Sequence, residues 1–195
     1  AWWEQQRRMG RTAVILTYAL GKAQRLLAEL RPWVREEEPV ILHGALVGLT
    51  EVIRGMGRDG PHRFEMAPTE PLLEPEGTKG RGRRQLDVTG RLVLAPPSAA
   101  GSSWLRRLGS DVALAVASGW MRVRGTRRRR NAERGFVLSD HADWPDLLRT
   151  IRETGARRIL VTHGRPDVLV RYLQESWGLD AAPLQTAFQA DPDAD

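Results

Sequence analysis

The fold is decided by the stretch TAVILTYALGKAQRLLAEL, residues 12–30. Residues 12–18 form a short, apolar, β-branched run, which predicts a buried strand. Residues 19–30 then repeat leucine and alanine at helical spacing, which predicts a helix. Residues 39–54, PVILHGALVGLTEVIR, repeat a strand and a helix in the same order. This βαβα order predicts an α/β fold with a parallel sheet covered by helices.

Further segments extend this pattern toward the C-terminus. Residues 58–90 contain four prolines and the string TKGRGRR and show little periodicity, so we expect a long loop or a poorly ordered insert. Each of the last two predicted helices has a proline just inside its start and a glycine just past its end. The other predicted elements are strands 91–95, 112–117, 136–139 and 158–162, and helices 104–108, 145–155 and 166–178.

Composition excludes several classes of protein. The chain has 195 residues, 41% of them hydrophobic, which is enough for one ordinary core or two small ones. No apolar run is long enough to cross a bilayer, and we expect a cytoplasmic protein with no membrane partner. Cysteine is absent, so a metal would have to bind His, Asp or Glu. The chain opens with alanine rather than methionine, and we therefore expect a fragment or a processed chain.

Basic charge is concentrated in one segment. The net charge is +6, while the C-terminal residues 191–195 form an acidic tail. The segment between Gly119 and Gly135 contains seven arginines and one acidic residue, Glu133. The arginines are Arg122, Arg124, Arg127, Arg128, Arg129, Arg130 and Arg134. Such a run is more often a solvated loop than a polyanion site, and composition alone leaves both open.

Two histidines follow predicted strands in consecutive strand–helix units. Because parallel strands end at the same edge of a sheet, we expect His141 and His163 to face one cleft, with Asp140 and Asp143 beside the first. Imidazole can bind zinc or transfer a proton near neutral pH. The alternative is that each histidine is a capping or surface residue and that Asp143 is a helix N-cap.

Other candidate residues carry weaker signals. The turn at residues 18–22, which ends in Lys22, could bind an anion through its backbone N–H groups or be purely structural. Trp104, Trp120 and Trp144 could stack on bases or belong to the core. We assign no catalytic role to the remaining histidines, His43 and His62.

Taken together, several motifs resemble the β-CASP branch of the metallo-β-lactamase superfamily, whose members cut RNA or DNA. SDHADW at residues 139–144 and LVTHG at residues 160–164 are similar to its two late histidine motifs. TYALGKAQRLL at residues 17–27 and ASGWM at residues 117–121 resemble the start and the end of its inserted cassette. The chain is most similar to the bacterial ligase-associated DNA exonucleases, a group also labelled mRNA 3′-end processing factors.

The resemblance implies a role for each matching residue. His141 would lie by the scissile phosphate and protonate the leaving oxygen, with Asp143 beside it, and His163 would ligate one of two zinc ions. The arginine run and Lys22 would bind backbone phosphates. Residues 1–125 would form a Rossmann-like β-CASP cassette, and residues 126–190 the C-terminal βαβα part of the metallo-β-lactamase αββα sandwich.

The main zinc motif of this family, His-x-His-x-Asp-His, does not occur in the sequence. The resemblance therefore implies the C-terminal part of a metal-dependent nuclease, inactive alone, acting on DNA or RNA and associated with an ATP-dependent DNA ligase or a helicase. A non-catalytic nucleic-acid-binding or scaffold subunit of the same fold is the alternative. A Rossmann-like small-molecule domain is disfavoured because no Gly-x-Gly-x-x-Gly follows the first strand.

Overall fold

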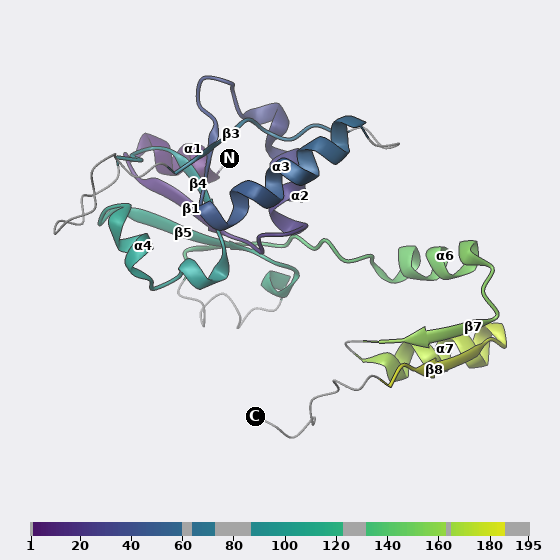
Figure 1. Ribbon diagram of the computed structural model, residues 1–195. Coiled ribbons are helices and arrows are strands. Elements are labelled where there is room, and N and C mark those ends of the chain that lie inside the picture. Colours follow the sequence, from purple (N-terminus) through teal and green to yellow (C-terminus); the bar gives the residue numbers. More distant parts are fainter. Residues whose placement is uncertain (1, 60–63, 73–86, 123–131, 163–164, 186–195) are drawn as a thin grey trace. The chain divides into compact units, whose positions relative to one another are not determined.

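A computed structural model describes residues 2–59, 64–72, 87–122, 132–162 and 165–185. The chain divides into two compact units, Ala1–Asp140 and His141–Asp195 (Figure 1). The resemblance places its own boundary after residue 125, and the assignment of the parts to a cassette and a hydrolase domain stays a prediction. None of the helices in the described parts of the chain is long and apolar enough to span a membrane.

The first unit is built on a six-stranded sheet with the strand order β3-β2-β4-β1-β5-β6. Every neighbouring pair in it is parallel, which confirms the predicted parallel α/β architecture. The strands are β1 (Thr12–Leu16), β2 (Val40–Leu42), β3 (Thr69–Pro71), β4 (Leu92–Ala95), β5 (Val112–Ala117) and β6 (Arg134–Phe136).

Helices cover both faces of this sheet, as the buried side chains of β1 show. Ala13 and Ile15 pack in one core cluster with residues of α2 and α3, whereas Val14 and Leu16 pack in another beneath α4. Figure 1 shows α2 and α3 on one side of the sheet and α4 on the other. The helices are α1 (Trp2–Arg8), α2 (Lys22–Leu30), α3 (Gly44–Asp59) and α4 (Ser103–Arg107), with 3-10 turns η1 (Arg31–Trp33), η2 (Pro97–Ala99) and η3 (Gly119–Arg122).

Arg11 joins the sheet to its surroundings where the strands begin. Its guanidinium donates to Glu133 at 2.7 Å, to Asp111 at 2.8 Å and to Gln6 at 2.8 Å. The hydrogen bonds from Arg11 hold the pKa of Glu133 below its ordinary value. One planar, permanently charged side chain thus links α1 to the segments that precede β5 and β6.

Both edge strands of the sheet differ from the sequence expectation. β3 lies inside residues 58–90, which were expected to be a loop, and residues 60–63 and 73–86 fall outside the described part of the chain. β6 ends at Phe136, where the sequence predicted a strand to begin, and residues 137–140 have no regular structure. Edge strands pair on one side only, so short polar sequences such as Thr-Glu-Pro are tolerated there. Such sequences lack the apolar pattern from which a strand is predicted.

The second unit has its own small core. It contains α6 (Trp144–Thr154), β7 (Arg158–Val161), α7 (Pro166–Trp177) and β8 (Asp180–Pro183), and β7 pairs in parallel with β8. Leu173 and Ala181 are buried between α7 and this two-stranded sheet. The predicted limits of both helices are confirmed to within a residue or two, whereas β8, with the short sequence Asp-Ala-Ala-Pro, was not predicted.

Candidate functional site

The parallel strands of the first unit end at one edge of the sheet, here called the carboxyl edge. Open α/β sheets bind their ligands at this edge, in the crevice where neighbouring strands connect in opposite directions. β1 connects through α2 toward β2, whereas its neighbour β4 connects through α4 to β5 on the other side. The residues that follow these strands are therefore the first place to look for a site.

A glycine turn joins β1 to α2 at the carboxyl edge. Gly21 has a φ of 79°, and its N–H donates to the Gln24 side chain at 2.7 Å. The Gln24 amide in turn donates to the buried Thr50 hydroxyl at 3.0 Å. These bonds fix the turn internally and occupy the Gly21 N–H, which favours the structural interpretation of the turn over anion binding by that group.

Lys22, which was predicted to bind nucleic acid, makes a largely buried ion pair. Its Nζ lies 3.1 Å from Asp140 Oδ1, and its side chain is only 6% exposed. The same ammonium lies over the ring of Tyr18, 4.6 Å from the ring centroid. Lys22 could therefore reach a phosphate only after leaving Asp140, and its predicted role remains a prediction.

The segment that ends in Asp140 is held against the start of α2. The Arg25 guanidinium donates to the carbonyl of Ser139. A Cβ atom at Gly21 would lie 2.6 Å from Asp140 Oδ2, so a larger residue there would displace the carboxylate from its present position. The Lys22–Asp140 pair was not foreseen, because its partners are far apart in the sequence and no local pattern joins them.

The strands that precede the two predicted site histidines lie in separate units. β6 is the edge strand of the six-stranded sheet of the first unit, and β7 pairs with β8 in the second unit. That these two strands end at one common edge stays a prediction. That His141 and His163 share a cleft stays a prediction, since His163 lies outside the described residues.

Asp143 caps a helix. Its Oδ1 accepts a hydrogen bond from Asp146 N at 2.9 Å, and Pro145 occupies the first turn of α6. This is the capping alternative that the sequence left open, and it is compatible with a second role because a carboxylate has further lone pairs. His141, two residues earlier, is exposed to solvent.

The predicted cationic residues are only partly described. Arg122 is exposed at the end of η3, whereas Arg124, Arg127, Arg128, Arg129 and Arg130 lie outside the described residues. Within the described ranges, no three His, Asp or Glu side chains come close enough together to hold a metal ion. The described residues alone therefore do not form a zinc site.

The three tryptophans considered for stacking have different environments. Trp104 packs edge-on against His43, with ring centroids 4.6 Å apart, and burial lowers the pKa of that histidine. Trp144 packs against Tyr172 in the second unit. Trp120, which follows β5 at the carboxyl edge, is 66% exposed.

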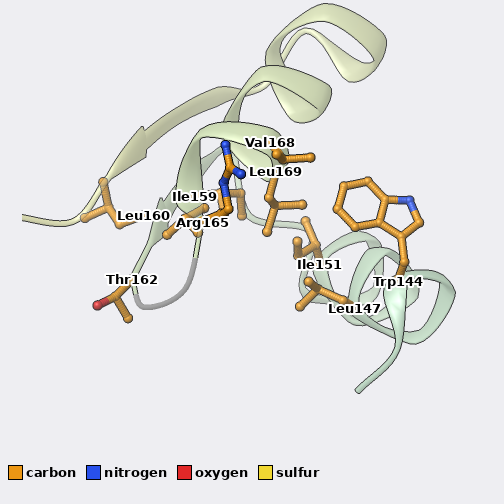
Figure 2. Close-up of a pocket in the computed structure, with 10 residues that line it drawn as sticks. Trp144, Leu147, Ile151, Ile159, Leu160, Thr162, Arg165, Val168 and Leu169 are labelled. Carbon is orange, nitrogen blue, oxygen red and sulfur yellow. The ribbon is translucent and has the colours of Figure 1, made fainter. Parts of the chain in front are cut away.

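The second unit contains a pocket of about 440 Å³ between α6 and the β7–α7 segment. Figure 2 shows Trp144, Leu147 and Ile151 of α6 facing Val168 and Leu169 of α7. The lining is mostly hydrocarbon, and Arg165 is its one charged member. Its chemistry does not suit a phosphate-binding site, and we assign it no role.

Comparison with known proteins identifies a relative of this chain. No protein-family model matches the chain. The chain is 31% identical over 170 residues to a protein of Opitutus terrae named "Probable DNA ligase". That match covers 86% of this chain but only 14% of the relative, so the chain is similar to a small segment of a much longer protein.

Proposed function

We propose that this chain is part of a zinc-dependent phosphodiesterase that cleaves nucleic acid. The observation that carries the proposal is the ion pair of Lys22 with Asp140, which holds the segment leading to His141 at the carboxyl edge of a parallel sheet. The similarity to a protein named as a DNA ligase supports nucleic acid as the substrate class, and so does the net charge of +6.

In this proposal the residues keep the roles that the family resemblance implies. His141 protonates the departing oxygen and Asp143 assists it, while His163 contributes one ligand to a zinc centre whose other ligands come from outside the described residues. Arg122 and the arginines that follow it bind backbone phosphates. We derive no catalytic step through the metal, since the described residues do not by themselves fit it.

A second candidate is a non-catalytic nucleic-acid-binding or scaffold subunit that associates with a DNA ligase or a helicase. A specific observation favours it. The two carboxylates that flank His141 in the sequence both have structural partners, because Asp140 pairs with Lys22 and Asp143 caps α6.

Metal content, together with binding and cleavage of end-labelled single-stranded DNA and RNA, distinguishes the candidates. The assay compares this chain with the same chain expressed together with the coding sequence upstream of it. We expect chelator-sensitive cleavage by the longer protein only, reduced at least about a hundredfold by His141→Ala because general acid catalysis contributes about that much or more.

The matched control is His43→Asn, since His43 Nδ1 accepts from Ala45 N and asparagine can do the same. Full activity of the short chain alone would contradict the partial zinc site. Binding without cleavage by the longer protein would favour the scaffold subunit, and absence of nucleic-acid binding would overturn both candidates.

A further inference from the structure

Two large aromatic side chains are exposed at the carboxyl edge of the six-stranded sheet. Trp120 is 66% exposed and Tyr18 is 52% exposed. Trp2 and Trp3, in contrast, pack against the core. Exposed tryptophan and tyrosine side chains are common where a protein contacts a ligand, because their rings gain much from being covered.

These two residues lie on neighbouring strand ends. β1 and β5 are paired in parallel up to Leu16 and Val116, so Tyr18 and Ser118 both stand two residues past that last pair. The Trp120 N–H donates to the Ser118 hydroxyl at 3.3 Å, which places Trp120 in the turn directly after β5.

A third segment joins the two turns. A Cβ atom at Gly119 would lie 3.6 Å from Ser139 Cβ, and one at Gly21 would lie 2.6 Å from Asp140 Oδ2. Because Ser139 and Asp140 are consecutive, the turn that carries Trp120 and the turn that follows Tyr18 meet at a single point. Tyr18 and Trp120 therefore come from neighbouring turns at the carboxyl edge of the first unit.

The Tyr18 ring and the backbone of the turn that carries Trp120 are held in place before any ligand arrives. The Tyr18 ring is covered on one side by the Lys22 ammonium, which Asp140 fixes. The η3 turn is closed by the Met121 N–H, which donates to the Ser118 carbonyl at 3.0 Å. A preorganised surface loses less conformational entropy on binding than a flexible one.

The surroundings of the rings favour a polyanion with planar groups. Arg122 is exposed in the same 3-10 turn as Trp120, and Arg25 lies on the helix that begins after Tyr18. An apolar peptide would use the rings but not the cations, whereas a nucleic acid uses both. Bases in a duplex are already stacked on each other, so only unpaired bases can cover protein rings.

We infer that Tyr18 and Trp120 form a stacking platform for the unpaired bases of a single-stranded nucleic acid. This inference rests on the proposed function and adds to it the form of the substrate, which is a single strand. Binding would not depend on base sequence, because every base has an aromatic face that can stack on a protein ring. Backbone phosphates lie toward the arginines while the bases cover the rings.

The experiment measures binding by fluorescence anisotropy with three probes. These are an oligothymidine of about 20 nucleotides, which exceeds the site of a single binding domain, an abasic strand of equal length, and the corresponding duplex. The variants are Tyr18→Ala and Trp120→Ala, with Tyr18→Phe and Trp120→Phe retaining a ring.

The matched control is Trp33→Ala. Trp33 is even more exposed, at 71%, but it follows the end of α2, which returns the chain from the carboxyl edge to the opposite edge. We expect each alanine variant at the platform to weaken oligothymidine binding by about fivefold or more and to leave binding of the abasic strand unchanged. The phenylalanine variants and Trp33→Ala should bind like the parent chain.

Contrary outcomes separate this inference from the proposed function. Unchanged oligothymidine binding in both alanine variants would overturn the platform but not the proposal of nucleic-acid binding. An equal loss of binding to oligothymidine and to the abasic strand would have the same meaning. A parent chain that prefers the duplex would overturn the single-strand assignment. A parent chain that binds none of the probes would overturn the nucleic-acid proposal together with the platform.

Discussion

Two buried threonines lie at the two ends of β1, Thr12 as its first residue and Thr17 directly after its last. In the described part of the chain, only one of the two hydroxyl groups makes a hydrogen bond. The Thr12 hydroxyl donates to the Val88 carbonyl at 3.0 Å. The Thr17 hydroxyl, equally buried, has no hydrogen-bond partner among the described residues. An unsatisfied buried hydroxyl lowers the free energy of unfolding, whereas a satisfied one contributes to it.

Replacing each threonine by valine, which has the same shape, therefore has opposite effects. We expect Thr17→Val to raise the free energy of unfolding by about 1 kcal/mol and Thr12→Val to lower it by a similar amount. Urea denaturation at neutral pH measures both. Destabilisation by Thr17→Val would show that this hydroxyl has a partner in the folded protein.

Gly21 combines two constraints that act on a single residue. Its φ of 79° strains any residue with a Cβ atom, and that atom would clash with the Asp140 carboxylate. Gly101 has a φ of 68°, but a Cβ atom there would meet no other atom of the described residues within 4 Å. At Gly101 only the backbone angle therefore disfavours a larger residue.

We expect Gly101→Ala to lower the free energy of unfolding by about 1 kcal/mol and Gly21→Ala to lower it by about 2 kcal/mol or more. Urea denaturation measures both effects. Equal effects would show that the Asp140 carboxylate moves aside at no cost in stability.

At the scale of the element, the start of α6 depends on the cap that Asp143 provides. Asparagine is an equally good N-cap, while alanine cannot accept the Asp146 N–H. We expect Asp143→Ala to lower the free energy of unfolding of the second unit by about 1 kcal/mol and Asp143→Asn to leave it nearly unchanged.

The same pair of variants separates capping from chemistry. In the longer protein of the proposed function, we expect Asp143→Asn to remove most of the cleavage activity while its circular dichroism and unfolding transition stay like the parent's. Retention of activity in this variant would leave Asp143 with the capping role alone.

Elements also differ in how well the sequence predicted them. The amphipathic helices α6 and α7 were predicted because their proline starts and glycine ends are local signals. The edge strands β3 and β6 were missed or displaced because the partner strand, and not their own sequence, makes them strands.

For the whole molecule, the two compact units contain separate cores. Leu27 is fully buried in the first and Leu173 in the second. Truncating a buried leucine to alanine lowers the free energy of unfolding by about 2 to 5 kcal/mol.

We expect Leu27→Ala to accelerate amide hydrogen exchange in the strands of the first unit only, and Leu173→Ala to accelerate it in α7 and β8 only. Hydrogen exchange followed by mass spectrometry measures both on the intact chain. Faster exchange in both units after either substitution would show that they unfold as one cooperative unit.

Local sequence was sufficient for the α/β class, the parallel arrangement of the first unit and the limits of α6 and α7, because periodicity, proline and glycine act over a few neighbouring residues. Strand order, the pairing of Lys22 with Asp140 and the neighbouring positions of the turns that carry Tyr18 and Trp120 required the folded chain. These features join segments about a hundred residues apart, and such contacts form only when burial of the sheet brings those segments together. Within the second unit, the pairing of β7 with β8 also required the folded chain.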